Sequence, residues 1–509
     1  MNATLQSKRR FKPLGTVLLS ILGVISKIIS VLFKIVLIIV IGTVGIGYYQ
    51  LTFPLFVFLF SISSVGISTT LTMQIAENGW GTLIQNKGFN YARKTTIIVS
   101  VVSSLILLLF SSLIAKIQGS AEIRYIYYSS TLAIISVSIL NLYRGVLRGN
   151  EKVQAYAISD ILEQLSKLIF AMIFAYLLIG FGELYAVIGV FLGIALSAVV
   201  ALVYIKIVMS KIEFQKPLSL NKFNKSQFLK FSLIAGLTSI LLPFVQFIDS
   251  IVVVRLLSIA GNSIIDATKL FGLSRGNVSA LLNLPNTIIV AIEFLLLPDL
   301  LKIQNRDKLC KKCQTTITIA LLLGAFMGAM FFAFSNEIMY FAYGKSLSGN
   351  EKEIASILLK IGSAAVIFSS ISQIQSVVLQ GIKKLHLPIV SLCVASIVKI
   401  VFELIFIRYI SIYAAELSNA LFYVSLAFTN GIFLLKNNIC FGNPYNMLFV
   451  PAIFAWVFIT WIVYKYILVN INFIFAIILA VVITTIIFLM IVVPIYLHNK
   501  KRKILIKLP

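Results

Sequence analysis

The sequence predicts an all-α polytopic membrane protein with about fourteen transmembrane helices. Three observations support this prediction: 60% of the 509 residues are hydrophobic, the mean hydropathy is +1.02, and long apolar runs recur along the whole chain. The net charge of +26 lies between these runs. Bilayer topology explains that charge more simply than nucleic-acid binding does.

Fourteen apolar runs are long enough to cross a bilayer, which takes about 20 residues at a rise of about 1.5 Å each. The first run is too long for a signal-peptide core, so we expect it to be retained. The connecting segments are short and hold no phosphate-binding loop motif, so we expect no catalytic residue, no cofactor and no enzymatic activity. Cys310 and Cys313 form a CxxC pair with too few further ligands for a metal site. The runs cover residues 17–42, 53–76, 95–115, 125–147, 155–179, 184–208, 231–257, 278–301, 315–335, 354–381, 387–410, 412–435, 448–467 and 472–497.

The distribution of Lys and Arg predicts the orientation. With the N-terminus inside, 29 of the 43 basic residues fall in cytoplasmic segments and 9 fall in segments on the opposite side. An excess of basic residues in the inner loops is typical of multi-pass proteins. We therefore expect both termini in the cytoplasm. We also expect a monomer in the cytoplasmic membrane, in contact with membrane lipids.

The sequence contains an internal repeat. LRGNEKVQAYAISDILEQLSKLIFAMIF from Leu147 matches LQGIKKLHLPIVSLCVASIVKIVFELIF from Leu379 at a constant offset. Six spans separate the two copies, so both have the same orientation, and we expect two parallel six-helix lobes plus two C-terminal helices. The predicted domains are an N-terminal lobe (1–225), a C-terminal lobe (226–440), and a segment (441–509) with the last two helices and a basic cytoplasmic tail.

Pro54 and Pro285 lie in the second and eighth spans, which correspond in the repeat. A proline inside a spanning helix removes a backbone hydrogen bond and bends the helix. We expect each proline to produce a helix bend, in a part of its lobe that moves when the protein opens and closes.

Lys27 and Lys34 lie inside the first span, two helical turns apart and therefore on one face. A lysine facing lipid at the bilayer centre costs about 2.5–3.5 kcal/mol on the insertion scale. Two explanations avoid that cost: a buried ion pair that only holds helices together, or a hydrated cationic cavity. No acid on the same span neutralises the two lysines, which favours the cavity. We assign both as candidate substrate-binding residues.

The fifth and eleventh spans carry charges at equivalent positions of the repeat. Glu163 and Lys167 are four residues apart, as are Lys399 and Glu403, and a local salt bridge would account for each pair. We also consider Lys167 and Lys399 as substrate-binding residues at matching depths on opposite walls, and Glu403 as an ion-coupling residue.

Asp249 in the seventh span has no basic residue within one turn of its own helix. A lone intramembrane carboxylate is a candidate site for a coupling ion such as Na⁺ or H⁺. The alternative is a partner on another helix. Lys399 would be that partner if the seventh and eleventh spans are adjacent, and transport would then depend on the membrane potential alone.

Four stretches resemble a known superfamily: SKIISVLFKIVLIIVIGTVGIGYYQLTFPLFVFLFSISSVGIS, LYRGVLRGNEKVQAYAISDILEQ, LFGLSRGNVSALLNLPNTIIVAIEFLLLPDL and VVLQGIKKLHLP. They are similar to the polysaccharide-transporter branch of the multidrug/oligosaccharidyl-lipid/polysaccharide flippases, and within it to stage V sporulation protein B and the lipid II flippases. The similarity covers most of the first twelve spans. It implies a V-shaped pair of lobes around a central cationic cavity, alternating access, and polyprenyl-diphosphate-linked saccharides as substrates.

The resemblance also implies roles for individual residues. Lipid II flippases carry cavity-lining arginines six residues apart in the first helix. Lys27 falls on the first of these positions, Phe33 aligns with the second, and Lys34 is one position beyond. Cation sites in the superfamily use a carboxylate of the seventh helix, and Asp249 resembles it.

We therefore expect a flippase for a lipid-linked saccharide precursor of the cell envelope, with cell-envelope synthesis proteins as partners and no nucleic acid. A cation-coupled multidrug exporter is one alternative and predicts an acidic or aromatic cavity. A membrane glycosyltransferase or polymerase is another and predicts paired carboxylates in a sizeable outer loop. The basic first span and the short loops favour the flippase.

Overall fold

The computed structural model describes residues 13–78, 88–210, 224–302, 305–344, 346–382, 384, 386–439 and 449–467, and the single residues 475, 479 and 482. Its regular elements within these ranges are all helices, and ten of them are long and apolar enough to cross a membrane. The prediction of an all-α multi-pass membrane protein is therefore confirmed. Apart from those three single residues, the predicted span 472–497 and the basic tail lie outside the described residues.

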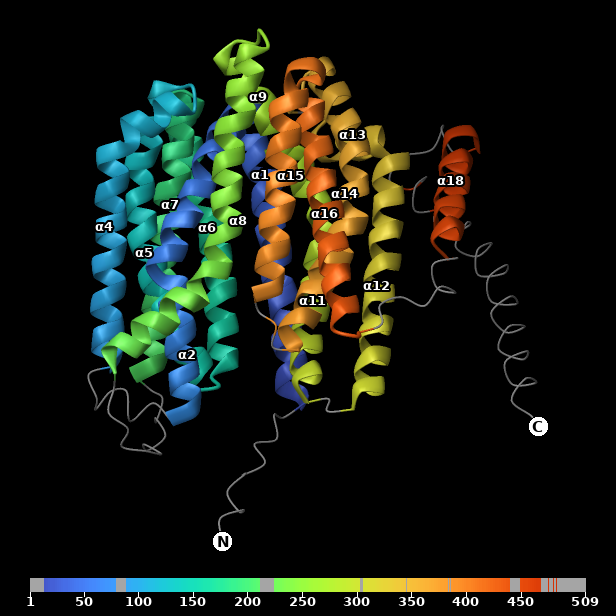
Figure 1. Cartoon of the computed structure of the whole chain (residues 1–509). Helices are drawn as coiled ribbons and strands as arrows, with labels where there is room; N and C mark the ends of the chain where they lie inside the picture. The colour runs from blue at the N-terminus through green and yellow to red at the C-terminus, as the bar shows by residue number, and fades with distance from the viewer. Residues whose placement is uncertain are drawn as a thin grey trace, which may run out of the picture.

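The N-terminal lobe forms one side of the molecule (Figure 1). Its helices are α1 (Pro13–Phe60), α2 (Gly66–Asn78), α4 (Gly88–Ile117), α5 (Arg124–Gly149), α6 (Val153–Leu178) and α7 (Glu183–Ser210). The π-helical segment η1 (Ser61–Val65) joins α1 to α2, and the 3₁₀ turns η2 (Ala121–Ile123) and η3 (Ile179–Phe181) precede α5 and α7. Inside α1, Gly42 has φ 69° and ψ −178°, a conformation that glycine adopts without strain. The first two predicted spans meet at this bend.

Apart from its first helix, which lies next to α1, the C-terminal lobe forms the other side (Figure 1). Its elements are α8 (Lys225–Ile259), α9 (Ile264–Gly272), the π-helical segment η4 (Leu273–Val278), α10 (Ser279–Leu282), α11 (Leu284–Lys302), α12 (Arg306–Ala333), α13 (Ser335–Tyr343), α14 (Gly349–Gly381), α15 (His386–Ile410) and α16 (Ile412–Lys436). A further helix, α18 (Phe449–Ile467), packs on α12 through the stacked rings of Phe326 and Trp456, whose centroids are 5.2 Å apart.

The structure corrects the predicted loop between the seventh and eighth spans. Residues 264–278 are helical and continue into α10 and α11, so Lys269 and Arg275 lie on helices and not in a loop. The polar residues of this segment resemble a loop in sequence. They are accommodated in a helix because α1 covers its apolar face, which includes the buried residue Phe271.

Residues at matched positions of the sequence repeat make equivalent helix contacts in the two lobes. α5 ends at Gly149 and α14 ends at Gly381, the positions matched in sequence. A Cβ at Gly149 would lie 2.6 Å from the Cβ of Ile75 in α2, and one at Gly381 would lie 2.9 Å from the Cβ of Leu300 in α11. Each lobe thus uses a glycine to bring its fourth helix against its second. The exact residue boundaries of the predicted domains stay a prediction.

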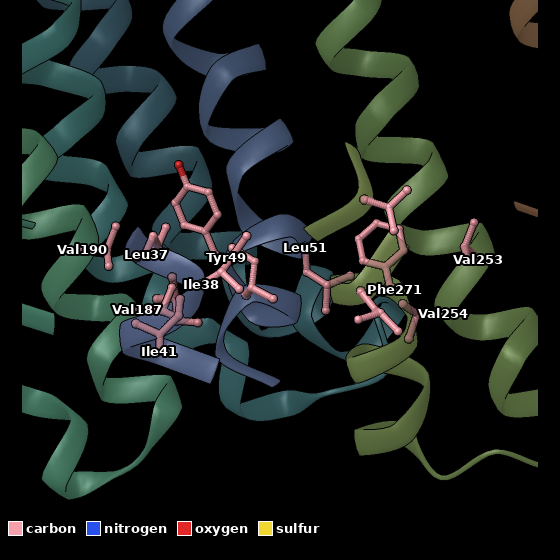
Figure 2. Close-up of a cluster of buried hydrophobic side chains, with 14 of the residues drawn as sticks. Leu37, Ile38, Ile41, Tyr49, Leu51, Val187, Val190, Val253, Val254 and Phe271 are labelled. Carbon is pink, nitrogen blue, oxygen red and sulfur yellow. The ribbon is translucent and has the colours of Figure 1, made fainter. Parts of the chain in front are cut away.

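The two lobes meet at α1, which belongs to the N-terminal lobe, and at α8, which belongs to the C-terminal lobe. Both helices lie in the middle of the molecule in Figure 1. Gly47 of α1 and Gly272 of α9 are in close contact, because a Cβ at Gly272 would lie 2.6 Å from the Gly47 amide nitrogen. Figure 2 shows the surrounding apolar cluster, in which side chains of α1 contact those of α7, α8 and α9. This packing closes the interface at the Gly42 end of the bundle. Towards the other end, Gly66 of α2 lies against the backbone of Ser232 in α8.

Candidate functional site

A cavity of about 170 Å³ lies between the lobes, with α1 on one wall and α8, η4, α14, α15 and α16 on the other. Its charged lining residues are Lys34, Asp249, Arg275 and Lys399. Counted from the Gly42 end of their helices, these residues lie roughly 12–17 Å deep at about 1.5 Å per residue. That depth is near the middle of a hydrocarbon core about 30 Å thick.

A second cavity, of about 660 Å³, shares part of this lining and extends toward the other end of the bundle. Both cavities are lined by Gln246, Asn283, Asn286, Ser369 and Tyr423. The second one reaches Gln380, the residue before α14 ends. By the charge distribution, this end is the predicted cytoplasmic side. The cavities thus form one continuous surface from mid-membrane toward that side, in which polar side chains alternate with apolar ones such as Val290 and Leu426.

Asp249 is the centre of a buried cluster of charges in the C-terminal lobe. Its Oδ2 accepts a hydrogen bond from Arg275 Nε at 2.9 Å, and its Oδ1 lies 2.7 Å from Lys399 Nζ. Asp249 is only 3% exposed and Lys399 only 5%. Burial of a charge without a partner is very costly, so this pairing fixes how α8, η4 and α15 pack.

Two further carboxylates, from Glu403 and Glu416, complete the cluster, and both residues are fully buried. Arg275 lies 3.7 Å from Glu403 and 3.6 Å from Glu416. Hydroxyl groups support both acids: Ser418 donates to Glu403 at 2.6 Å and Ser274 donates to Glu416 at 2.8 Å. One guanidinium therefore connects acids from three helices, which its planar set of five donors makes possible.

The N-terminal lobe holds a separate ionic cluster between α5 and α6. Arg144, which is 9% exposed, places Nη1 2.6 Å from Glu163 and 3.6 Å from Asp160. Ser26 of α1 also donates a hydrogen bond to Asp160. This cluster ties α1 to α5 and α6, and its residues do not line the mid-membrane cavity.

The lysines predicted to bind substrate lie in different environments. Lys34 lines the cavity, whereas its neighbour Phe33 is buried and the centre of its ring lies 5.0 Å from Lys167 Nζ. Lys167 is not among the residues that line the mid-membrane cavity, although Lys399 is, so the two positions of the repeat differ in their surroundings. The side chain of Lys27 lies outside the described residues.

Asp249 has cationic partners on other elements, so it is not a lone carboxylate. α8 packs on α15, so the alternative partner Lys399 reaches it, and Arg275 joins from η4. Lys399 is 3.9 Å from Glu403, farther than it is from Asp249. Glu163 likewise contacts Arg144 from a neighbouring helix. An ion-coupling role for Asp249 and Glu403 stays a prediction, and the Lys399–Asp249 pair supports the alternative in which transport depends on the membrane potential alone.

Both prolines lie near interruptions of a helix. Pro54 lines the cavity and lies inside α1, which ends at the π-helical segment η1. Pro285 is in the first turn of α11, directly after the break at Asn283.

The sequence alone does not identify Arg275 and Glu416 as residues of this site. Polar residues surround Arg275 in the sequence, and such a segment is typical of a loop. Glu416, in contrast, lies within a predicted span, and an acid in such a span is by itself a signal of a buried partner.

The fold and the cavity define a two-lobed helical membrane protein with a polar site at its centre. Comparisons with known proteins identify the class. The family model described as "Polysaccharide biosynthesis protein" matches residues 14–300, and the MatE model matches residues 302–405. The chain therefore belongs to the polysaccharide biosynthesis protein family, within the multidrug/oligosaccharidyl-lipid/polysaccharide superfamily.

Two relatives come from Bacillus subtilis (strain 168). Stage V sporulation protein B is 23% identical over 345 residues, covering 65% of this chain and 67% of the relative. Lipid II flippase MurJ is 23% identical over 463 residues, covering 85% of this chain and 84% of the relative.

Solved structures show the same fold. The inward closed conformation of lipid II flippase MurJ matches with a TM-score of 0.70 at 15% identity, covering 94% of this chain and 99% of that one. An inward-facing multidrug resistance MATE transporter matches with a TM-score of 0.65 at 15% identity, covering 86% and 98%.

Proposed function

We propose that this protein flips a polyprenyl-diphosphate-linked saccharide across the cytoplasmic membrane by alternating access. The observation that carries the proposal is the mid-membrane cavity, whose charged lining residues are three cations and one anion. A diphosphate is the anionic part of such a substrate. Lysine binds it as a point charge, and both Lys34 and Lys399 line the cavity. Arg275 also lines the cavity, although its Nε and one Nη group donate to Asp249. The similarity to a lipid II flippase and the family match support this substrate class.

The packing supports a path for the head group. Gly47 and Gly272 close the lobes at one end, while the two cavities extend from Lys34 to Gln380 near the other end. The saccharide and diphosphate enter from the Gln380 end, and the polyprenyl chain stays in the bilayer. Separation of α1 from α9, with closure at the Gln380 end, then exposes the head group on the other side.

The charges also distinguish this proposal from export of organic cations. Lys34, Arg275 and Lys399 are the cations at the cavity surface and Asp249 is the anion there, whereas Glu403 and Glu416 lie fully buried behind Arg275. The cations that reach the surface can pair with a diphosphate, and the two buried acids are not exposed to a cationic drug. In this setting the chain is a monomer with both termini in the cytoplasm and receives its substrate from cell-envelope synthesis.

Reconstitution into liposomes tests the function directly. Fluorescent polyprenyl-diphosphate saccharide is incorporated, and a membrane-impermeant quencher reports which leaflet holds it. We expect transfer between leaflets that protein-free liposomes do not show, and no export of a fluorescent organic cation in parallel vesicles. Export of the organic cation without transfer of the lipid would refute the proposal.

A further inference from the structure

The second cavity differs chemically from the charged one beside it. Its lining includes five carboxamide side chains, from Gln246, Asn283, Asn286, Gln373 and Gln380. Among the described residues that line it, none is Lys or Arg, and the one carboxylate is Glu293. Carboxamides both donate and accept hydrogen bonds, so they suit a neutral ligand rich in hydroxyl or amide groups.

Hydrogen bonds among these side chains hold part of the second cavity's lining in place before a ligand binds. Ser369 of α14 donates to the side-chain oxygen of Asn286 at 3.1 Å, Asn286 donates to that of Asn283 at 3.2 Å, and Asn283 donates to the carbonyl of Ser279 at 2.7 Å. The chain of bonds connects α14 with the α10–α11 junction. Polar groups held in this way lose little freedom when a ligand binds, which favours selective recognition.

The position of the wall relates it to the diphosphate site. Gln246, Asn283 and Asn286 line both cavities, so the carboxamide surface begins where the charged one ends. Tyr423 also lines both and offers a ring beside the junction. A head group whose diphosphate lies near Lys34 and Arg275 would place its next chemical group against the carboxamides.

We propose that the carboxamide wall, formed by Gln246, Asn283, Asn286, Gln373 and Gln380, is the subsite for the saccharide and selects a neutral sugar over an acidic one. This inference rests on the proposed function. The hydroxyl and acetamido groups of a neutral N-acetylhexosamine pair with the carboxamides. A hexuronic acid would bring a carboxylate to a wall that offers Glu293 and no cation among its described lining residues, so its charge would be poorly compensated.

Binding measurements with three probes test the subsite. The probes are polyprenyl diphosphate alone, the same lipid carrying a neutral N-acetylhexosamine, and the same lipid carrying a hexuronic acid. For the wild-type protein in detergent we expect the neutral sugar to bind more tightly than the bare lipid, by about 2- to 12-fold for each hydrogen bond gained. We expect the uronic acid to bind more weakly than the neutral sugar.

Variants of single carboxamide residues show whether these residues cause the preference for the neutral sugar. Gln373→Leu and Gln380→Leu should each lower the ratio of neutral-sugar to bare-lipid affinity by about 2- to 12-fold. The control Gln154→Leu makes the same change on an exposed face of α6 and should keep the wild-type ratio. Thermal unfolding of each variant shows that it is folded.

The outcomes separate the two proposals. If the wild type binds the bare lipid and the neutral-sugar lipid equally, or prefers the uronic acid, the saccharide subsite is refuted while the flippase proposal stands. Equal loss of affinity for all probes in the two glutamine variants would also refute it. Failure of the wild type to bind any of the three lipids would instead refute the proposed function.

Discussion

At the scale of single residues, the main feature is the way Arg275 and Lys399 share one carboxylate. Asp249 accepts from both, and each cation also lies near Glu403. Removal of one partner from a buried pair leaves an uncompensated charge and costs about 3–5 kcal/mol. The cluster therefore links the stability of the C-terminal lobe to the charge state of its cavity.

A double-mutant cycle tests this link. We expect Lys399→Met to destabilise the protein strongly, because Asp249 then loses a cation at 2.7 Å. Adding Asp249→Asn should recover part of the loss, since the second change removes the unpaired charge. Thermal unfolding in detergent measures both effects. Additive losses in the double variant would contradict the pairing.

Lys34 should act on substrate more than on folding. It lines the cavity and is partly exposed there, so Lys34→Ala removes a positive charge without opening the core. We expect flipping of the lipid-linked saccharide to fall at least about tenfold, with Lys34→Glu worse because it repels the diphosphate.

The matched control is Lys206→Ala, which removes a lysine from an exposed face of α7. It should retain wild-type flipping and stability in the liposome assay. If Lys34→Ala unfolds the protein, the explanation that this lysine only holds helices together is correct.

At the scale of elements, the second helix of each lobe is interrupted by a π-helical segment. η1 comes directly after the part of α1 that contains Pro54, and η4 lies before α10 and the Pro285 turn. A π turn adds one residue and rotates the next stretch of helix, and such segments recur at functional sites. In η4 this geometry places Arg275 in the charge cluster of α8, α15 and α16.

A polar contact joins the lobes at the Gly42 end. Glu351, in the first turn of α14, accepts a hydrogen bond from Thr43 of α1 at 3.0 Å and lies 2.7 Å from Lys269 of α9. It also accepts from the backbone of Ser348 in a capping box. One carboxylate therefore holds three segments together beside the Gly47–Gly272 contact.

Loss of this contact should favour opening at the Gly42 end. We expect Glu351→Gln to increase the labelling of a cysteine placed at Ile46, which is buried at this lobe contact, by an impermeant thiol reagent, because the ion pair with Lys269 is lost. Glu353→Gln is the control, since it neutralises an exposed acid on the same helix turn. Equal labelling in both variants would show that Glu351 does not hold this end closed.

At the scale of the whole molecule, the two lobes share a repeat but not their chemistry. Lys399 belongs to the buried cluster at the cavity, whereas Lys167 lies near Phe33 and outside the cavity lining. The duplicated helices thus supply the framework, and the side chains differ between the walls. This asymmetry places most of the charged cavity surface on the C-terminal lobe.

The orientation prediction concerns the whole chain. A cysteine in place of Ser219, in the sequence segment that joins the predicted sixth and seventh spans, should be protected from impermeant thiol reagents in intact cells, because the basic segments are predicted to be cytoplasmic. A cysteine at Ala260, an exposed residue between α8 and α9, is the accessible reference. Equal labelling of the two sites in intact cells would overturn the orientation.

The energy source should be the membrane potential. Asp249 already has two cationic side chains within salt-bridge distance, so a bound Na⁺ or H⁺ is not needed to balance its charge. We expect flipping in proteoliposomes to respond to an imposed potential and not to a sodium or proton gradient of equal size at zero potential. Acceleration by either gradient, lost in Asp249→Asn, would instead support ion coupling through this residue.

The class of protein, the course of most spanning helices and the repeat can be predicted from the sequence. Hydropathy, basic loops and matched segments are sufficient for these features, because the bilayer selects apolar runs of sufficient length independently of their neighbours. The sequence also indicates Lys34, since a lysine inside a span needs a polar environment.

The pairing of the charges, in contrast, is set by the tertiary structure. The partners of Asp249 are 26 residues away in η4 and on another helix at Lys399, and Glu351 meets Thr43 across 308 positions of the chain. No local pattern encodes such pairs, because a buried charge is neutralised by whichever helices pack against it. Arg275 is an example: its polar sequence neighbours are typical of a loop. Only the packing of the helices places it at the centre of the site.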